Sequence, residues 1–239
     1  MFPFLDLQGF RQAARAGAPD ARLYCLADHS GMPGLRRELD QAHVSWTSLF
    51  EGSGEAGAIE VAPFLFSLDE AFESGRANLI RWVAEHATYT SSLLMLATPL
   101  DLRELAARLA RRLDASLPDQ IDVMLRYFDP RVFEALTLAL DDVQKDAFLG
   151  TADCWRWVDR GGAIHTMPAR FHAADSFTPP LRLDTRQERA KSAPWWLPVK
   201  RTRSRCAWPN WCRNPMSPCR FPSAMYSFRP RSTPRACWG

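Results

Sequence analysis

Two arginines and an aspartate lie close together in the sequence R-Y-F-D-P-R, residues 126–131. Guanidinium groups bind carboxylates and phosphates through paired hydrogen bonds, and a nearby carboxylate can hold them in place. Arg126, Asp129 and Arg131 could therefore recognise, or act on, an acidic or phosphorylated ligand. The same residues also have a common structural role, because Asp129 suits the N-cap of a helix and an arginine can form an ion pair with it.

The other residues with catalytic or metal-binding chemistry form no recognisable pattern. The histidines are scattered, and no H-E-x-x-H motif occurs. Asp28, His29 and Ser30 supply the residue types of a catalytic triad, but adjacent residues rarely adopt triad geometry. No G-x-S-x-G motif occurs, and the glycine-rich segment 52–57 lacks the lysine of a phosphate-binding loop. We therefore expect the chain to have no catalytic residue, cofactor or metal, and we do not expect it to be an enzyme.

The elements on either side of R-Y-F-D-P-R determine where its charges lie. Residues 121–128 alternate between two faces, as a strand does. Asp129 is then a suitable N-cap, and Pro130 suits the first position of a helix. This pattern predicts a strand that runs directly into a helix, with the three charges at the carboxyl end of the strand. That end is where α/β folds commonly bind ligands.

Further elements follow from periodicity, caps and turn residues. Further strands are expected at residues 22–28, 44–50, 61–68, 92–96, 152–158 and 163–167, the last two as a hairpin. Helices are expected at residues 5–16, around 35–39, 69–87, 98–113 and 141–149. Pro63 suggests that its strand lies near a sheet edge. Strands alternate with helices between residues 22 and 140, which predicts an α/β fold with a mixed or mainly parallel sheet flanked by helices.

The predicted helix at residues 98–113 has the clearest apolar periodicity in the chain. Thr98 and Asp101 resemble a capping box with proline at the first helical position. Four arginines are predicted to form a solvated face of this helix, and one of them has a favourable i,i+4 partner in Glu104. They are Arg103, Arg108, Arg111 and Arg112.

The composition changes abruptly near residue 190. Residues 1–190 hold 20 Lys+Arg and 27 Asp+Glu, whereas residues 191–239 hold 10 Lys+Arg and no acidic residue. This tail also contains 8 of the 18 prolines, 5 of the 9 tryptophans and 4 of the 6 cysteines. It could bind single-stranded nucleic acid, but its cysteines lack the C-x-x-C spacing of a zinc site. We expect a disordered tail, or an out-of-frame reading of a GC-rich gene, which resequencing would test.

The sequence predicts a cytoplasmic location. The opening residues M-F-P-F have no basic segment, and Asp6 interrupts the apolar start. The longest apolar run, residues 93–97, is too short to cross a bilayer. Cys25 and Cys154 are isolated and are expected to be buried, reduced thiols.

R-Y-F-D-P-R-V, residues 126–132, resembles the signature of a family of type VI secretion effector adaptors, also called effector chaperones. Four further segments resemble other landmarks of that family in matching order. They are L-Y-C-L-A-D (23–28), S-L-F-E-G (48–52), V-A-P-F-L (61–65) and F-L-G (148–150). The resemblance covers about residues 20–190.

The resemblance implies a bacterial adaptor that binds a toxic effector and helps to load it onto the VgrG spike protein or its PAAR tip, without catalysis. Its implied partner-binding residues are Arg126, Asp129, Arg131, Phe50, Glu51 and Pro63. Neither a membrane nor a nucleic acid is expected as a partner. The alternatives are an enzyme or ligand-binding domain that uses Arg126, Asp129 and Arg131, or a nucleic-acid binder that uses the basic tail.

The resemblance also implies three segments. Residues 1–168 would form the α/β adaptor domain, and residues 169–190 would begin a truncated helical C-terminal lobe. Residues 191–239 would be the irregular tail. If the missing part of the second lobe helps to hold the effector, this chain would be impaired in binding.

Overall fold

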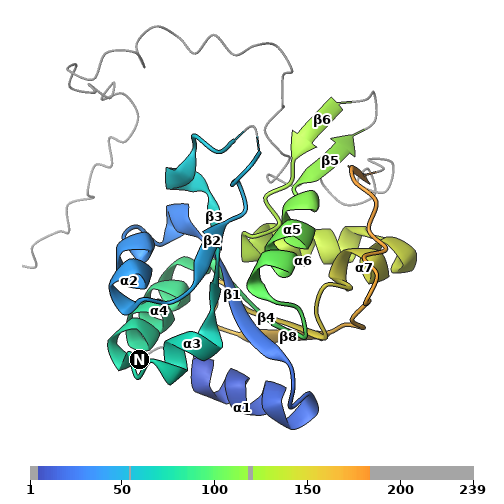
Figure 1. Cartoon of the computed structure of the whole chain (residues 1–239). Helices are drawn as coiled ribbons and strands as arrows, with labels where there is room; N and C mark the ends of the chain where they lie inside the picture. Colours follow the sequence, from blue (N-terminus) through green and yellow to red (C-terminus); the bar gives the residue numbers. More distant parts are fainter. Residues whose placement is uncertain (1–4, 54, 118–120, 184–239) are drawn as a thin grey trace, which may run out of the picture. The chain divides into compact units, whose positions relative to one another are not determined.

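The structure, a computed structural model, describes residues 5–53, 55–117 and 121–183. All of them belong to the unit Met1–Arg201, and a second unit, Thr202–Gly239, lies outside them. The described helices are α1 (Leu7–Gly17), α2 (Leu35–Ala42), α3 (Leu68–Glu73), α4 (Ala77–Thr90), α5 (Leu102–Arg111), α6 (Pro130–Ala139) and α7 (Asp142–Leu149). The described strands are β1 (Arg22–Asp28), β2 (Trp46–Ser48), β3 (Pro63–Ser67), β4 (Leu93–Thr98), β5 (Asp114–Leu117), β6 (Ile121–Met124), β7 (Cys154–Val158), β8 (Ile164–Pro168) and β9 (Leu181–Arg182) (Figure 1). The predicted tail and the predicted boundary at residue 190 fall outside the described residues.

The main sheet has the strand order β2-β3-β1-β4-β7-β8, and every neighbouring pair is antiparallel. The predicted α/β class is confirmed, but the prediction of a mixed or mainly parallel sheet is wrong for the main sheet, and of the two described sheets only the small second one is mixed. β1 and β2 do point the same way, as do β3 and β4, because each pair flanks a common antiparallel neighbour. α2 thus connects β1 to β2, and α3 with α4 connects β3 to β4. In each case the two strands run in the same direction but are separated by another strand of the sheet. This split arrangement leaves no parallel neighbours in the main sheet.

The strand predicted at residues 121–128 is shorter and belongs to a different sheet. β6 ends at Met124 and pairs with β5 in a small second sheet of order β6-β5-β9. The chain then turns through residues 125–129 before α6 begins at Pro130. In this small sheet β5 and β9 are parallel. The predicted helix start is confirmed, whereas the strand before it does not belong to the main sheet.

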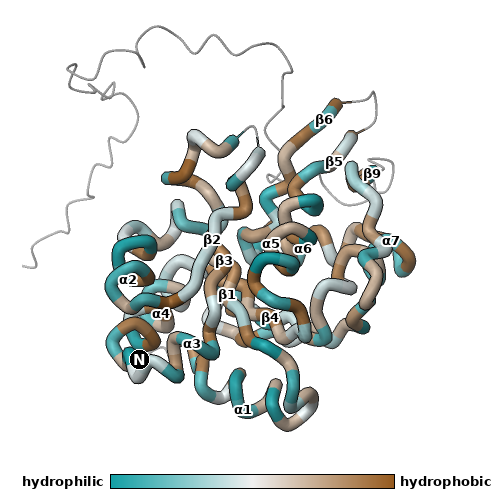
Figure 2. Tube along the Cα trace, viewed as in Figure 1, coloured by the Kyte–Doolittle hydropathy of each residue, from teal (hydrophilic) through white to brown (hydrophobic). Residues whose placement is uncertain are grey.

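The core lies on both faces of the central strands. β3 and β4 are buried along their whole length, and β1 is buried except for its first residue. Figure 2 shows the apolar character of these strands. In Figure 1, α2, α3 and α4 lie on one side of β1–β3, and α5, α6 and α7 lie on the other. Pro63 opens β3, which lies between β1 and the edge strand β2, so its strand is near the sheet edge, as predicted, but is not the edge strand itself.

Two predicted helices differ in their limits. The helix expected at residues 69–87 is divided into α3 and α4, and Gly75 between them has a φ of +65°. A positive φ is readily adopted by glycine and stops an α-helix. α5 begins after Asp101, whose side chain accepts a hydrogen bond from the backbone N–H of Glu104. The N-cap is therefore Asp101, not Thr98.

The arginines of α5 only partly follow the prediction of a solvated face. Arg103 is exposed, and the predicted pair between Glu104 and Arg108 is present at 2.7 Å. Arg108 and Arg112, however, are buried. The prediction is wrong for these two because the segment that follows β8 lies over them.

That segment, residues 169–183, is held to α5 by hydrogen bonds from the arginines. Arg108 donates to the carbonyl oxygens of His172 (2.8 Å) and Ala173 (2.6 Å). Arg112 forms an ion pair of 2.8 Å with Asp175. Guanidinium groups can satisfy several acceptors at once, so they suit the attachment of an irregular segment to a helix.

Candidate functional site

The site begins at the N-terminus of α6, where Asp129 caps the helix. Its carboxylate accepts a hydrogen bond of 3.0 Å from the backbone N–H of Arg131. The same carboxylate also binds the Arg131 guanidinium, with Nε 2.7 Å from Oδ1 and Nη2 bonded to Oδ2. Asp129 therefore starts the helix and fixes the position of the arginine that follows it.

Arg126 reaches a different aspartate, at the end of β1. Its Nη2 lies 2.9 Å from Oδ2 of Asp28, although the two residues are 98 positions apart in the sequence. Oδ1 of Asp28 accepts hydrogen bonds from the hydroxyl (2.5 Å) and the backbone N–H (3.1 Å) of Ser30. Asp28, Arg126, Asp129 and Arg131 thus form one group, which we call the junction cluster.

The charges of the junction cluster are paired, and their exposure is uneven. Only 6% of the Asp28 side chain and 7% of the Asp129 side chain are exposed, against 44% for Arg126 and 31% for Arg131. The hydrogen bond to Asp129 raises the pKa of Arg131, and the negative charges of Asp129 and Asp28 act in the same direction. The cluster therefore presents guanidinium groups to the surface above buried carboxylates.

The other predicted site residues lie at the same end of the main sheet. Pro63 opens β3 directly opposite Asp28 of β1, and its carbonyl oxygen accepts a hydrogen bond from the residue after β2. Phe50 and Pro63 are buried, so they support this end of the sheet from within. Glu51 is exposed and accepts a hydrogen bond of 2.9 Å from Thr47. Of the six predicted residues, three have charged side chains at the surface, namely Arg126, Arg131 and Glu51, whereas Asp129, Phe50 and Pro63 are buried.

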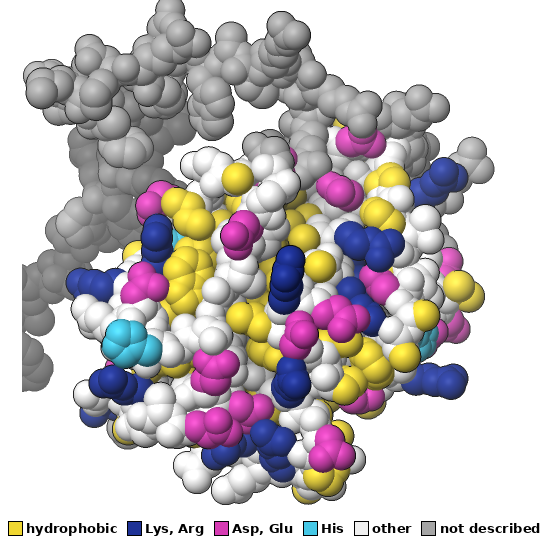
Figure 3. All heavy atoms as spheres, in the orientation of Figure 1, with side chains coloured by type: hydrophobic (Ala, Val, Ile, Leu, Met, Phe, Trp, Pro, Cys, Tyr) yellow, Lys and Arg dark blue, Asp and Glu magenta, His cyan; other side chains and the backbone are white. Residues whose placement is uncertain are grey.

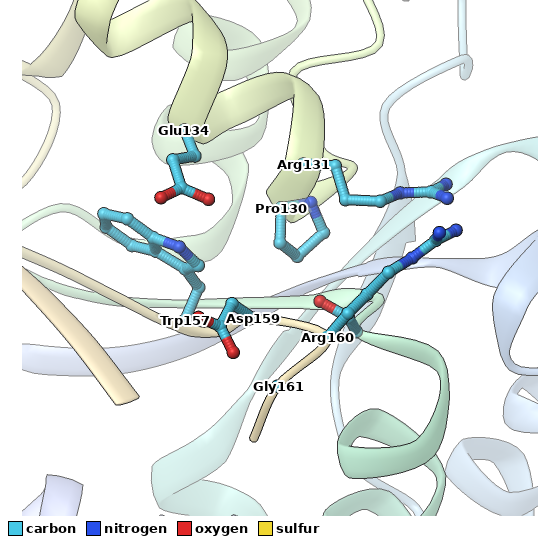
Figure 4. Close-up of a pocket in the computed structure, with 8 residues that line it drawn as sticks. Pro130, Arg131, Glu134, Trp157, Asp159, Arg160 and Gly161 are labelled. Atoms are coloured by element: carbon cyan, nitrogen blue, oxygen red, sulfur yellow. The ribbon is translucent and has the colours of Figure 1, made fainter. Parts of the chain in front are cut away.

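A pocket of about 270 Å³ adjoins the junction cluster. α6 contributes Pro130, Arg131 and Glu134 to its wall, and the end of β7 with the following turn contributes the rest, apart from Ser91 (Figure 4). Ser91, which follows α4, is attached to β7, because its hydroxyl donates to the carbonyl oxygen of Val158 over 2.6 Å. This hydrogen bond holds the backbone at the end of β7, which forms part of the pocket wall.

The described part of the chain contains no group of three or more His, Cys, Asp or Glu side chains that could hold a metal ion. His29 instead stacks on Phe64, with 4.3 Å between ring centroids, and His165 lies 2.9 Å from Asp159. None of the helices in the described residues is both long and apolar enough to cross a membrane. Figure 3 shows acidic and basic side chains interspersed with apolar ones on the face drawn.

Two residues of this region were missed by the sequence analysis. Asp28 was considered for a catalytic triad and as the end of the segment L-Y-C-L-A-D, but not as a partner of Arg126, although an acidic residue at a strand end beside the other landmarks is a usable signal. Trp157, which lines the pocket, lies in a strand that was predicted, but nothing in the local sequence indicates which residues face it.

The sequence model of one family matches residues 23–147 of the chain, and that family is described as Domain of unknown function (DUF4123). The match spans just over half of the 239 residues and contains every residue of the junction cluster. No curated protein and no solved structure matches the chain.

Proposed function

The chain belongs to the DUF4123 family, and from this premise we propose that it is an adaptor that binds a type VI secretion effector and helps to load it onto the VgrG or PAAR spike. The family description gives no function. The proposal draws on the resemblance of R-Y-F-D-P-R-V and four further segments to the effector adaptors. A cytoplasmic location is part of the proposal.

One observation supports the proposal most directly. Residues from the landmarks that carry the resemblance, far apart in the sequence, meet at one end of the main sheet. Asp28, the last residue of L-Y-C-L-A-D, pairs at 2.9 Å with Arg126, the first residue of R-Y-F-D-P-R-V. Pro63, from V-A-P-F-L, lies opposite Asp28 in the neighbouring strand. A set of charged residues gathered in this way from separate segments suits a surface that recognises another protein.

Binding at this surface would rest on complementarity and would involve no chemical step. Arg126 and Arg131 each keep a partly exposed guanidinium that is held by a buried carboxylate. Such prepositioned groups lose little side-chain entropy when a partner binds, and paired charges contribute more to specificity than to affinity. The apolar contacts of the effector would supply most of the binding free energy.

The alternative of an enzyme or a domain for an acidic ligand has less support. An anion would have to compete with Asp28 and Asp129, which already occupy the guanidinium groups of the junction cluster at hydrogen-bond distance. The alternative of nucleic-acid binding depends on residues 191–239, which lie outside the described residues.

The proposal is tested by deleting the gene in the bacterium that encodes it and isolating the assembled spike. We expect the spike to form without its effector, and the full-length chain supplied in trans to restore loading. A spike that carries its effector at the normal level without this chain would contradict the proposal.

A further inference from the structure

The pocket beside the junction cluster contains a buried hydrogen-bond donor that has no partner. Trp157 is 3% exposed, and within the described residues no acceptor lies within hydrogen-bond distance of its Nε1. Figure 4 shows the indole nitrogen on the side of the ring that faces Pro130, with the Glu134 carboxylate pointing toward the ring from α6. A buried donor without an acceptor costs free energy, so its presence in a pocket wall points to a ligand.

Two of the charged groups around the pocket are already occupied. The carboxylate of Asp159 accepts a hydrogen bond of 2.9 Å from the backbone N–H of Ala163 and lies 2.9 Å from His165. The guanidinium of Arg131 is bound by Asp129. Figure 4 places Arg131 and Arg160 on the other side of Pro130 from the indole ring. The groups that face a ligand beside Trp157 are therefore its own N–H and the Glu134 carboxylate.

The chemistry of these two groups selects the ligand. A carboxylate would accept from Trp157 but would be repelled by Glu134 and Asp159, which both line the pocket. An ammonium group would bind Glu134 but has no acceptor for the indole N–H. An amide satisfies both, because its oxygen accepts and its nitrogen donates.

We infer that this pocket binds an amide group, whose carbonyl oxygen accepts from Trp157 Nε1–H and whose N–H donates to Glu134. A pocket of about 270 Å³ has room for such a group. A single water occupies only about 30 Å³ of liquid volume. Glu134 has a flexible side chain that can change rotamer on the nanosecond timescale, and such a movement would accompany the entry of a ligand beside the indole ring.

The amide could come from an Asn or Gln side chain or from a peptide group, and on the proposed function it belongs to the bound polypeptide. The pocket shares Arg131 with the junction cluster, so a segment that contacts the cluster can place a residue in the pocket. The pocket would then recognise one amide group of that segment. This last step rests on the proposed function, but binding of the amide itself does not.

The test is an NMR titration of the full-length chain, labelled with ¹⁵N, that follows the indole N–H signal of Trp157, assigned with Trp157→Phe. The probes are acetamide, N-methylacetamide, acetate and methylammonium. We expect acetamide to shift this signal saturably, and acetate and methylammonium to bind at least roughly five-fold more weakly. A stronger effect of N-methylacetamide would identify a peptide group as the natural ligand.

Two variants make the result decisive. Glu134→Gln keeps the shape of the side chain but removes its charge, and it should weaken acetamide binding by roughly five-fold. Glu73→Gln, an exposed residue of α3, is the matched control and should leave binding unchanged. Equal binding of acetamide and acetate, or no shift with any probe, would overturn the inference. Saturable acetamide binding in a chain that co-purifies with no effector would leave the pocket intact and count against the proposed function alone.

Discussion

Asp129 combines two roles in one carboxylate. It caps α6 through the backbone N–H of Arg131 and also holds the Arg131 guanidinium. Because only 7% of its side chain is exposed, both interactions are shielded from water. The structural and the recognition interpretations of this residue are therefore compatible, since the cap positions the arginine at the surface.

Replacing Asp129 by alanine should lower the free energy of unfolding by about 1–2 kcal/mol, because α6 loses its cap and Arg131 loses its partner. Chemical denaturation measures the change. Asp129→Asn should cost less, since asparagine caps nearly as well.

Asp141→Ala is the matched control for this prediction. Asp141 caps α7 with a capping box that involves Gln144, away from the junction cluster. Its loss should affect stability by a similar amount but leave partner binding unchanged. Unaltered stability of Asp129→Ala would contradict the role of Asp129 as a cap.

At the scale of single residues, the sequence predicted the cap of α6 and an arginine partner for Asp129, but not the ion pair between Asp28 and Arg126. Asp129 and Pro130 are local signals, and local signals can be read directly. The bond between Asp28 and Arg126 joins residues 98 positions apart, and no periodicity or spacing carries that information. The same is true of Trp157, whose position in the pocket wall depends on how β7 packs beside α6.

At the scale of elements, α5 is the part that holds the irregular segment 169–183 in place. Arg112 is fully buried and donates to the carbonyl oxygens of Phe148 (2.8 Å) and Ala147 (3.0 Å), in addition to its ion pair with Asp175. It therefore joins α5, α7 and the segment that follows β8 through one side chain.

Arg112→Met should destabilise the fold by about 3 kcal/mol, because several carbonyl groups lose their donor and Asp175 keeps only Arg111 as an ion-pair partner. Arg103→Met is the control on the same helix. Arg103 is exposed, so its replacement should change stability by no more than about 0.5 kcal/mol. Thermal or urea unfolding compares the two, and equal effects would contradict the burial of Arg112.

The same ion pair predicts how stability depends on pH. Burial by itself raises the pKa of Asp175, but the hydrogen bond and the positive charge of Arg112 outweigh it, so the pKa is lowered on balance. The folded state therefore binds this proton less readily than the unfolded state. The stabilisation is complete above the unfolded pKa of about 3.9 and is lost as the pH falls through the folded pKa.

Asp175→Asn should therefore flatten the acid side of the stability curve. Unfolding free energies measured from about pH 5 downward should fall less steeply in the variant than in the wild type. Parallel curves would mean that the carboxylate titrates at the same pKa in both states, contrary to its pairing with Arg112.

Local elements were predicted well, but their arrangement was not. The hairpin of β7 and β8 and the capped helix α7 follow from turn and cap residues. β5, with the sequence D-A-S-L, alternates polar and apolar residues over four positions only and has no β-branched residue, which is too weak a pattern to predict a strand. β6 and β9 pair with it on either side. The order of the main sheet depends on which strand lies between two others, and helix–strand alternation does not specify this.

At the scale of the whole molecule, four of the five landmarks of the resemblance meet at one end of the main sheet, whereas F-L-G (148–150) lies near the other end, beside Thr98 of β4. β1 ends there, β3 begins there, and α6 brings the junction cluster to the same place. We propose that the partner binds at this end of the sheet. Binding there is the central claim of the proposed function.

The most direct test is co-purification of tagged full-length chain from the bacterium that encodes it, analysed by mass spectrometry. Wild type and Arg103→Ala should each recover one large effector together with a VgrG or PAAR protein. Arg126→Ala should remain folded, as judged by thermal unfolding, but lose the effector. If Arg126→Ala recovers as much effector as wild type, or if folded wild type recovers neither partner, the account is contradicted.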